Sequence, residues 1–173
     1  MPRNYRFCPM CAAPLGRRVL ADRDRLVCTR CEFVLWQNPI VGVAVIVEQE
    51  SAILLGRRSR GVYRGLWCIP CGYVEADEHV RDAARREFWE ETGLEVEVGD
   101  VYTVHSNFHN PEVPTVGIWF RGTVTAGTPR AADDLDAVEF VPIEAYSTHS
   151  LAFPTDRLVL ERLCRETSNG RRS

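Results

Sequence analysis

The stretch Gly72–Leu94, GYVEADEHVRDAARREFWEETGL, organises the whole chain. From Glu78 to Thr92 its spacing and composition are those of a helix. Gly93 follows at the position where a residue of left-handed conformation commonly ends a helix. We therefore expect a helix over residues 78–92 that ends at Gly93.

Three carboxylates gather on one side of this helix. Glu90 and Glu91 lie about 60° to one side and about 40° to the other side of Glu87, because each residue turns a helix by about 100°. Val80 and Ala84 lie on the same side, whereas a solvated run of charges lies opposite the apolar stripe. Acids in the last turn also oppose the helix dipole by ~0.3–1 kcal/mol each, so a positive partner is expected. Oxygen ligands without His or Cys predict Mg²⁺ or Mn²⁺ rather than zinc; a solvated helix is the alternative.

Arginines surround this acidic cluster in the sequence. Magnesium held by carboxylates keeps positions for substrate phosphates, so the predicted substrate is a phosphate or a diphosphate. Arg86 is placed to orient a neighbouring carboxylate through its fork of hydrogen bonds. The arginines expected to receive phosphate charge precede the helix: Arg57, Arg58, Arg60 and Arg64. For each of these four, an exposed side chain that serves solubility is the alternative.

Two Cys-x2-Cys pairs, Cys8/Cys11 and Cys28/Cys31, stand sixteen residues apart near the start of the chain. This spacing is typical of a four-cysteine zinc ribbon. Structural zinc supplies roughly 10 kcal/mol or more of folding free energy, which so short a segment lacks. Four thiolates leave no open position for a substrate, so we expect Zn²⁺ to be structural; four unliganded thiols are the alternative.

The remaining chain has the pattern of a mixed α/β domain. Gln37-Asn38-Pro39 is predicted to be a junction, which gives a zinc ribbon over residues 1–36 and a larger domain over 37–173. Besides the helix described above, the expected elements are a hairpin of Ile40–Val47 and Ala52–Leu55, an arginine-rich loop over 57–64, strands over 66–69, 95–104, 116–125 and 138–141, a helix over 154–165, and a loose tail over 167–173.

Composition excludes several classes of protein. The chain has 173 residues, of which 45% are hydrophobic and 26% charged, which argues against disorder and coiled coils. Its formal charge is −3, with arginine supplying all the cations, so no broad nucleic-acid surface is predicted. Seven cysteines without a secretory signal favour a reducing cytoplasm. The longest apolar run, Ile40–Val47, is far below the ~20 residues that span a bilayer, so no membrane segment is expected.

At every defined position the Gly72–Leu94 stretch resembles the Nudix box. The resemblance implies a Nudix hydrolase, an α/β/α sandwich with a mixed sheet that binds magnesium and cleaves nucleoside diphosphates linked to another group. The metal ligands that it implies are Glu87, Glu90 and Glu91, with the Gly72 carbonyl as a further one. It makes Arg86 the partner that orients these acids, and Glu78 a structural residue paired with Arg86.

A four-cysteine ribbon ahead of this box resembles Nudix members that act on dinucleotide-like diphosphates. NADH pyrophosphatases carry Ser-Gln-Pro-Trp-Pro-Phe-Pro after the box, whereas residues 106–111 here are Ser-Asn-Phe-His-Asn-Pro. ADP-ribose or FAD pyrophosphatase activity is therefore the leading expectation, with NADH pyrophosphatase as the alternative. A second alternative is a non-catalytic nucleotide-sensing or nucleic-acid-binding module that uses the ribbon. A homodimer is plausible from the family alone.

Other candidate site residues lie outside the box. The family often places its general base on a separate loop, where Asp133, Asp134 and Asp136 are candidates, with a glutamate of the box as the alternative. Phe108 is expected to bind substrate together with Arg57, Arg58 and Arg64, and His109, Tyr102 and Trp119 are further aromatic candidates. Packing in the core is the alternative for aromatic residues in strands. Cys68 and Cys71 are expected to be small buried side chains, although family members commonly have Gly in place of Cys71.

Overall fold

A computed structural model describes residues 5–170 of the chain, with side chains as far as residue 168. The chain divides into two compact units, Met1–Pro39 with Asn110–Val113, and Ile40–His109 with Pro114–Ser173. The boundary that we place between residues 36 and 37 stays a prediction. Within the described residues, no helix is both long and apolar enough to cross a membrane.

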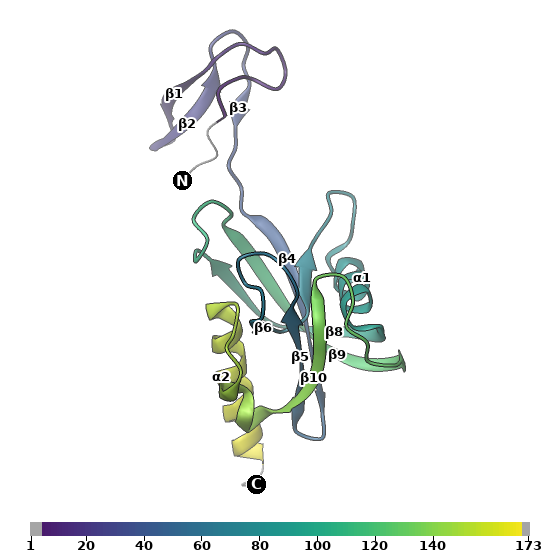
Figure 1. The fold of residues 1–173 in the computed structure, drawn as a ribbon. Helices are drawn as coiled ribbons and strands as arrows, with labels where there is room; N and C mark the ends of the chain where they lie inside the picture. Colours follow the sequence, from purple (N-terminus) through teal and green to yellow (C-terminus); the bar gives the residue numbers. More distant parts are fainter. Residues whose placement is uncertain (1–4, 171–173) are drawn as a thin grey trace. The chain divides into compact units, whose positions relative to one another are not determined.

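The smaller unit is built around a three-stranded antiparallel sheet (Figure 1). Its strands are β1 (Leu15–Leu20), β2 (Arg23–Cys28) and β3 (Val34–Leu35). Cys8, Ala13 and Cys28 form its buried cluster, so two of the four thiols occupy the centre of this unit. So few buried apolar side chains give little hydrophobic stabilisation, as expected for a fold that depends on a metal.

The larger unit contains a seven-stranded mixed sheet of order β10-β5-β4-β9-β8, with β6 paired to β5 and β7 to β4. Strands β4 and β9 run parallel, and every other pairing is antiparallel. The strands are β4 (Ile40–Gln49), β5 (Ala52–Arg58), β6 (Trp67–Cys68), β7 (Cys71–Tyr73), β8 (Leu94–Asn107), β9 (Thr115–Gly127) and β10 (Leu135–Pro142).

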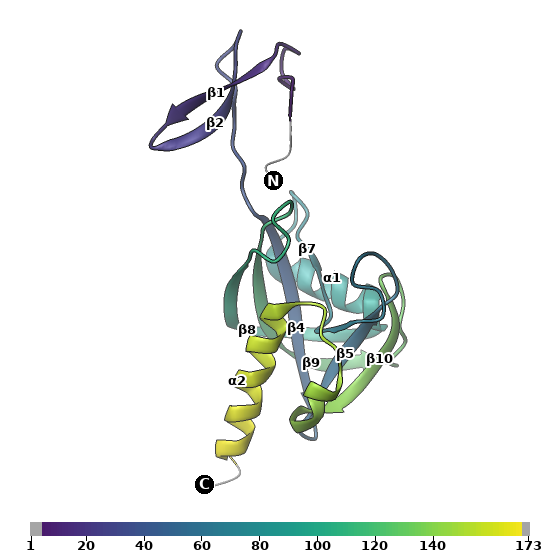
Figure 2. The same ribbon diagram turned by 60° about the vertical axis from the view of Figure 1, so that its left-hand side comes forward.

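Helices cover both faces of this sheet, α1 (Val80–Thr92) on one and α2 (Pro154–Gly170) on the other (Figures 1 and 2). A 3-10 helix, η1 (Ile143–Thr148), leads from β10 towards α2. Alternate residues of β4 serve the two cores, since Val45 packs in the cluster that contains α1 and Ile46 in the one that contains α2. A strand buried on both faces is a near-continuous apolar run, as β4 is. The expected α/β/α sandwich is confirmed.

Several expected elements differ in extent from the observed ones. Arg57 and Arg58 end strand β5 instead of lying in a loop, because β10 pairs with β5 along this length. The two strands of the predicted hairpin, β4 and β5, pair only next to the turn that joins them. Earlier along β4, its partner is β7. Helix α2 continues to Gly170, so the loose tail expected from Thr167 is wrong at its start; residues 171–173 lie outside the described residues.

Candidate active site

Helix α1 begins at Val80, two residues after the predicted start at Glu78, and ends at Thr92 as predicted. The imidazole Nδ1 of His79, its N-cap, accepts from the backbone N–H of Arg81 over 3.3 Å. At the other end, Gly93 has φ 68° and donates its N–H to the carbonyl of Trp89 over 2.8 Å. Phe88, which is buried, fixes the rotation of the helix against the sheet. The three glutamates therefore lie in the last two turns, and Glu91 turns inward.

Glu91 is a carboxylate inside the protein, with 1% of its surface exposed. Its Oε2 accepts the backbone N–H of Cys71, at the start of β7, over 2.8 Å. Burial raises the pKa of Glu91 to about 8. Because the backbone of Cys71 supplies the donor, this hydrogen bond does not depend on which side chain stands at position 71.

Glu87 lies against the backbone of β7. A Cβ added to Gly72 would collide with the Glu87 carboxyl group, so only glycine fits here. Glu87 is half-buried, and burial raises its pKa, against the effect of Arg86. The Glu87 carboxyl group thus packs directly against the backbone at Gly72.

Arg86 holds three carboxylates with one guanidinium. Its Nε and Nη2 donate to the two oxygens of Glu78, each over 2.8 Å, which confirms the expected pairing with this residue. Its Nη1 donates to Glu87 over 2.9 Å and to Glu90 over 3.1 Å. The hydrogen bond with Glu78 is the main reason that the pKa of Arg86 is raised. Arg86 is a rigid orienting group whose charge is already shared among three acids.

The donors at this end of α1 suit a hard cation. Glu87, Glu90, Glu91 and the Gly72 carbonyl offer only oxygen atoms, the set that Mg²⁺ or Mn²⁺ prefers. Two of the acids, Glu87 and Glu91, have a raised pKa because burial disfavours their charged forms, an effect that a bound cation would offset. Their roles as metal ligands stay predictions.

The four cysteines of the smaller unit converge. Their sulfur atoms all lie within 4.8 Å of one another, the only such group of metal-ligating residues in the described part of the chain. The measured separations include 3.4 Å from Cys11 to Cys28 and 3.7 Å from Cys8 to Cys31. Sulfurs at ~2.3 Å from a tetrahedral zinc ion lie ~3.8 Å apart, so the cluster has the right size. Hydrogen bonding from the Arg30 backbone lowers the pKa of Cys28 to about 6, which favours the thiolate.

Comparison with known families agrees with this geometry. Residues 37–163 match the NUDIX domain, and residues 6–37 match the zinc ribbon described as Nudix N-terminal. The chain belongs to the Nudix family. It is therefore a Nudix hydrolase, from a family of pyrophosphohydrolases that act on nucleotides with the help of a divalent metal.

Individual Nudix relatives match the chain to different extents. An ADP-ribose pyrophosphatase from Methanocaldococcus jannaschii is 32% identical over 145 residues, which are 83% of this chain and 82% of that protein. An NAD-capped RNA hydrolase, NudC, from Vibrio parahaemolyticus is 32% identical over 97 residues, which are 56% of this chain and 36% of that protein. The crystal structure of a NUDIX hydrolase from Nitrosomonas europaea superimposes with a TM-score of 0.82 at 28% identity, covering 96% and 94% of the two chains.

The arginines and aspartates that we assigned separately in this Nudix protein are partners of one another. Asp134 accepts from Arg58 over 2.8 Å and also pairs with Arg60. The other pairs are Arg60 with Asp133 at 2.9 Å and Arg57 with Asp136 at 2.6 Å. Both predicted roles, phosphate binding and general base, stay predictions, and each would require breaking or sharing a pair. Arg64 forms no ion pair with any residue that the structure describes.

The aromatic candidates separate into core and surface. Tyr102 and Trp119 belong to the core under α2, so the alternative of core packing holds for both. Phe108 is 75% exposed, and its role in substrate binding stays a prediction. His109 contacts two rings that the sequence analysis missed, Tyr63 and Phe153. The sequence offered only their positions as a signal: Tyr63 lies in the arginine-rich loop, and Phe153 directly precedes the last helix.

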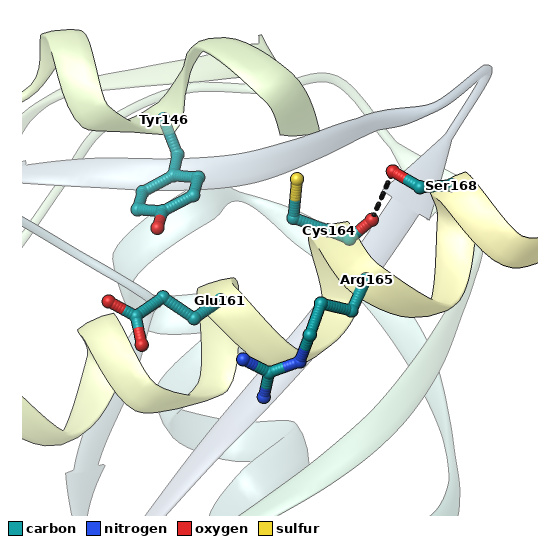
Figure 3. Close-up of a pocket in the computed structure, with 5 residues that line it drawn as sticks. All are labelled: Tyr146, Glu161, Cys164, Arg165 and Ser168. Atoms are coloured by element: carbon teal, nitrogen blue, oxygen red, sulfur yellow. Dashed lines mark hydrogen bonds between the residues drawn. The ribbon is translucent and has the colours of Figure 1, made fainter.

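Two open hollows lie on the larger unit. One, of about 430 Å³, is lined by Tyr146 of η1 and by Glu161, Cys164, Arg165 and Ser168 of α2, and it contains no residue of the box (Figure 3). The other, of about 380 Å³, is lined by Trp89, Glu90, Gly93, Thr128, Pro129 and Arg130. Only the second borders the acidic cluster, through Glu90.

Cys68 is buried and Cys71 is half-buried, and both are free thiols.

Proposed function

We propose that the protein hydrolyses the diphosphate of ADP-ribose or of an FAD-like dinucleotide in a magnesium-dependent reaction. With ADP-ribose, water attacks one phosphorus atom, the P–O bond of the anhydride breaks, and AMP and ribose 5-phosphate leave as dianions with release of two protons. The observation that carries this proposal is the buried carboxyl group of Glu91, held by the Cys71 N–H, beside the contact of Glu87 with Gly72.

The chain's own residues prepare this site. The Cys71 N–H fixes one oxygen of Glu91 and leaves the other available. Arg86 fixes Glu87 and Glu90 from the opposite side, so the acids need little reorganisation. When bound, magnesium would polarise a phosphoryl oxygen and make a water molecule a better nucleophile. We assign Glu87, Glu90, Glu91 and Arg86 as the catalytic set on this basis.

Further parts of the proposal concern the ribbon and the setting. Cys8, Cys11, Cys28 and Cys31 would hold one structural Zn²⁺, supported by sulfur separations close to those of a tetrahedral site. A cytoplasmic location is proposed because free thiols persist in reducing compartments.

The substrate choice is supported by the M. jannaschii relative, which is named an ADP-ribose pyrophosphatase and matches most of both chains. Cleavage of NADH is the second candidate, favoured by the match to NudC, although this chain spans only about a third of that protein.

The test is a panel of ADP-ribose, FAD and NADH, each incubated with and without magnesium, with products separated by chromatography. We expect AMP to form from ADP-ribose or FAD only with magnesium. Preferential cleavage of NADH would replace the leading substrate with the alternative. Binding of these nucleotides without any magnesium-dependent product would contradict the enzymatic proposal and favour a sensing module.

A further inference from the structure

Three aromatic rings from distant parts of the larger unit meet at one place. Tyr63 comes from the segment between β5 and β6, His109 follows β8, and Phe153 directly precedes α2. The Tyr63 ring lies 5.2 Å from Phe153 and 6.1 Å from His109, both edge to face. The His109 and Phe153 rings are 5.6 Å apart. All three residues belong to the same compact unit.

These rings are not an ordinary piece of the core. Tyr63 and Phe153 are half-buried, resting on a small apolar cluster of Cys68, Leu135 and Ala152. His109 is exposed, and a polar imidazole adds little apolar burial to such a cluster. Edge-to-face contacts at these separations leave ring surface accessible for a further stacked ring.

The cluster lies close to the acidic site through Cys71, which packs against the same apolar cluster as Tyr63 and Phe153 and donates its backbone N–H to Glu91 over 2.8 Å. The Arg58 guanidinium carbon lies 5.6 Å from the centre of the Phe153 ring. Burial acts to lower the pKa of Arg58, but the neighbouring acidic groups, Glu91 among them, outweigh it and raise this pKa. A substrate base stacked on these rings would therefore need only a short linker to place its phosphates at the glutamates.

We propose that Tyr63, His109 and Phe153 form the subsite that stacks the planar heteroaromatic base of the substrate, and so select substrates with a base at that end of the diphosphate. This inference rests on the proposed function and adds to it the residues that recognise the base. Aromatic side chains stack on bases of any sequence because every base has a π-face.

The test compares two ligands that differ in the base. AMP and ribose 5-phosphate carry the same sugar and phosphate charge, and only AMP has a planar base. We expect calorimetry on the full-length protein to show AMP binding at least about tenfold more tightly than ribose 5-phosphate, the range of one aromatic–base stack. A wild-type ratio near one would overturn the proposal.

Variants of the ring residues then test whether the rings cause the difference in affinity between AMP and ribose 5-phosphate. Tyr63→Leu and His109→Ala should each bring the affinity ratio close to one while affinity for ribose 5-phosphate stays the same. Val62→Ala is the matched control, because Val62 is the neighbour of Tyr63 and is 89% exposed. His109→Ala removes an exposed side chain, so it answers the question even if Tyr63→Leu fails to fold. Retention of the ratio in His109→Ala and in a folded Tyr63→Leu protein would overturn the proposal.

The experimental outcomes distinguish a failure of this inference from a failure of the proposed function. The affinity ratio is measured without turnover, so it reports on the rings even if no substrate is cleaved. Magnesium-dependent cleavage of ADP-ribose together with a ratio near one would reject the ring subsite alone. A high ratio that depends on the rings, without any cleavage, would reject the enzymatic proposal and keep the subsite.

Discussion

The carboxyl group of Glu87 occupies the space that a side chain at Gly72 would need. Helix α1 and strand β7 meet at this contact, and both belong to the box. Glycine is required here because a carboxylate approaches the backbone closely. A left-handed backbone is not the reason, since Gly72 does not have a positive φ.

Replacing Gly72 with alanine is expected to displace Glu87. Magnesium-dependent hydrolysis should fall at least tenfold, and the free energy of unfolding should decrease by about 1–3 kcal/mol, the usual effect of overpacking. Gly42→Ala is the control, because a Cβ there meets only ordinary contacts at 3.5 Å or more. Activity of Gly72→Ala equal to that of the control would contradict the role of this contact.

Replacing Glu91 with glutamine should reduce turnover by orders of magnitude with little change in melting temperature. The amide oxygen of glutamine still accepts the Cys71 N–H, and it removes a charge that is unfavourable in a buried position. Steady-state kinetics with magnesium and thermal unfolding measure the two effects. Unchanged turnover would remove Glu91 from the catalytic set.

Replacing Arg86 with lysine should lower kcat/KM roughly 10- to 100-fold, the usual effect of losing a group that orients metal ligands. Lysine cannot make the two parallel hydrogen bonds with which Arg86 holds Glu78. Arg85→Lys is the matched control, since Arg85 is exposed and pairs with exposed Asp82. Equal rates for the two lysine variants would refute this role of Arg86.

Asp156 should make stability depend on pH. It is buried, accepts the N–H of Ile69 over 3.0 Å and that of the Trp119 indole over 3.3 Å, and burial raises its pKa to about 7. An unfolded aspartate titrates near ~3.9, so between these values the folded protein holds a proton that the unfolded chain has lost. The contribution of Asp156 to the free energy of unfolding is therefore greatest at low pH and decreases as the pH rises to about 7.

Urea unfolding of the wild type and of Asp156→Asn checks this sign. The stability of the wild type relative to the variant should decline from about pH 5 to about pH 7 and then level off. Asp82→Asn, at an exposed position, should follow the wild type throughout. A relative stability that stays flat over the same interval would show that Asp156 is already ionised in the folded protein.

Replacing Cys28 with serine should abolish zinc binding. We expect one zinc per wild-type chain by elemental analysis and none in the variant, because three thiolates and a hydroxyl bind zinc far more weakly. Cys164→Ser is the control, as Cys164 belongs to α2 and lies outside the cluster. Full zinc content in Cys28→Ser would contradict the four-thiolate site.

The sequence predicts features that depend on short spacing. Helical periodicity is enough to place Glu87 and Glu91 on the buried side of α1, and the spacing of the cysteine pairs is enough to predict their convergence. The pairing of Arg58 with Asp134 depends instead on the register of β5 against β10, which joins residues 76 positions apart. The meeting of Tyr63 with Phe153 depends in the same way on the tertiary fold, so residue patterns alone could not predict it.

The pairing of Arg57, Arg58 and Arg60 with Asp133, Asp134 and Asp136 also bears on the kinetics of encounter. Three cations balanced by three anions at close range produce little net field beyond a Debye length. A nucleotide in solution is therefore not steered towards this rim by long-range attraction, and its association rate is expected to change little with ionic strength.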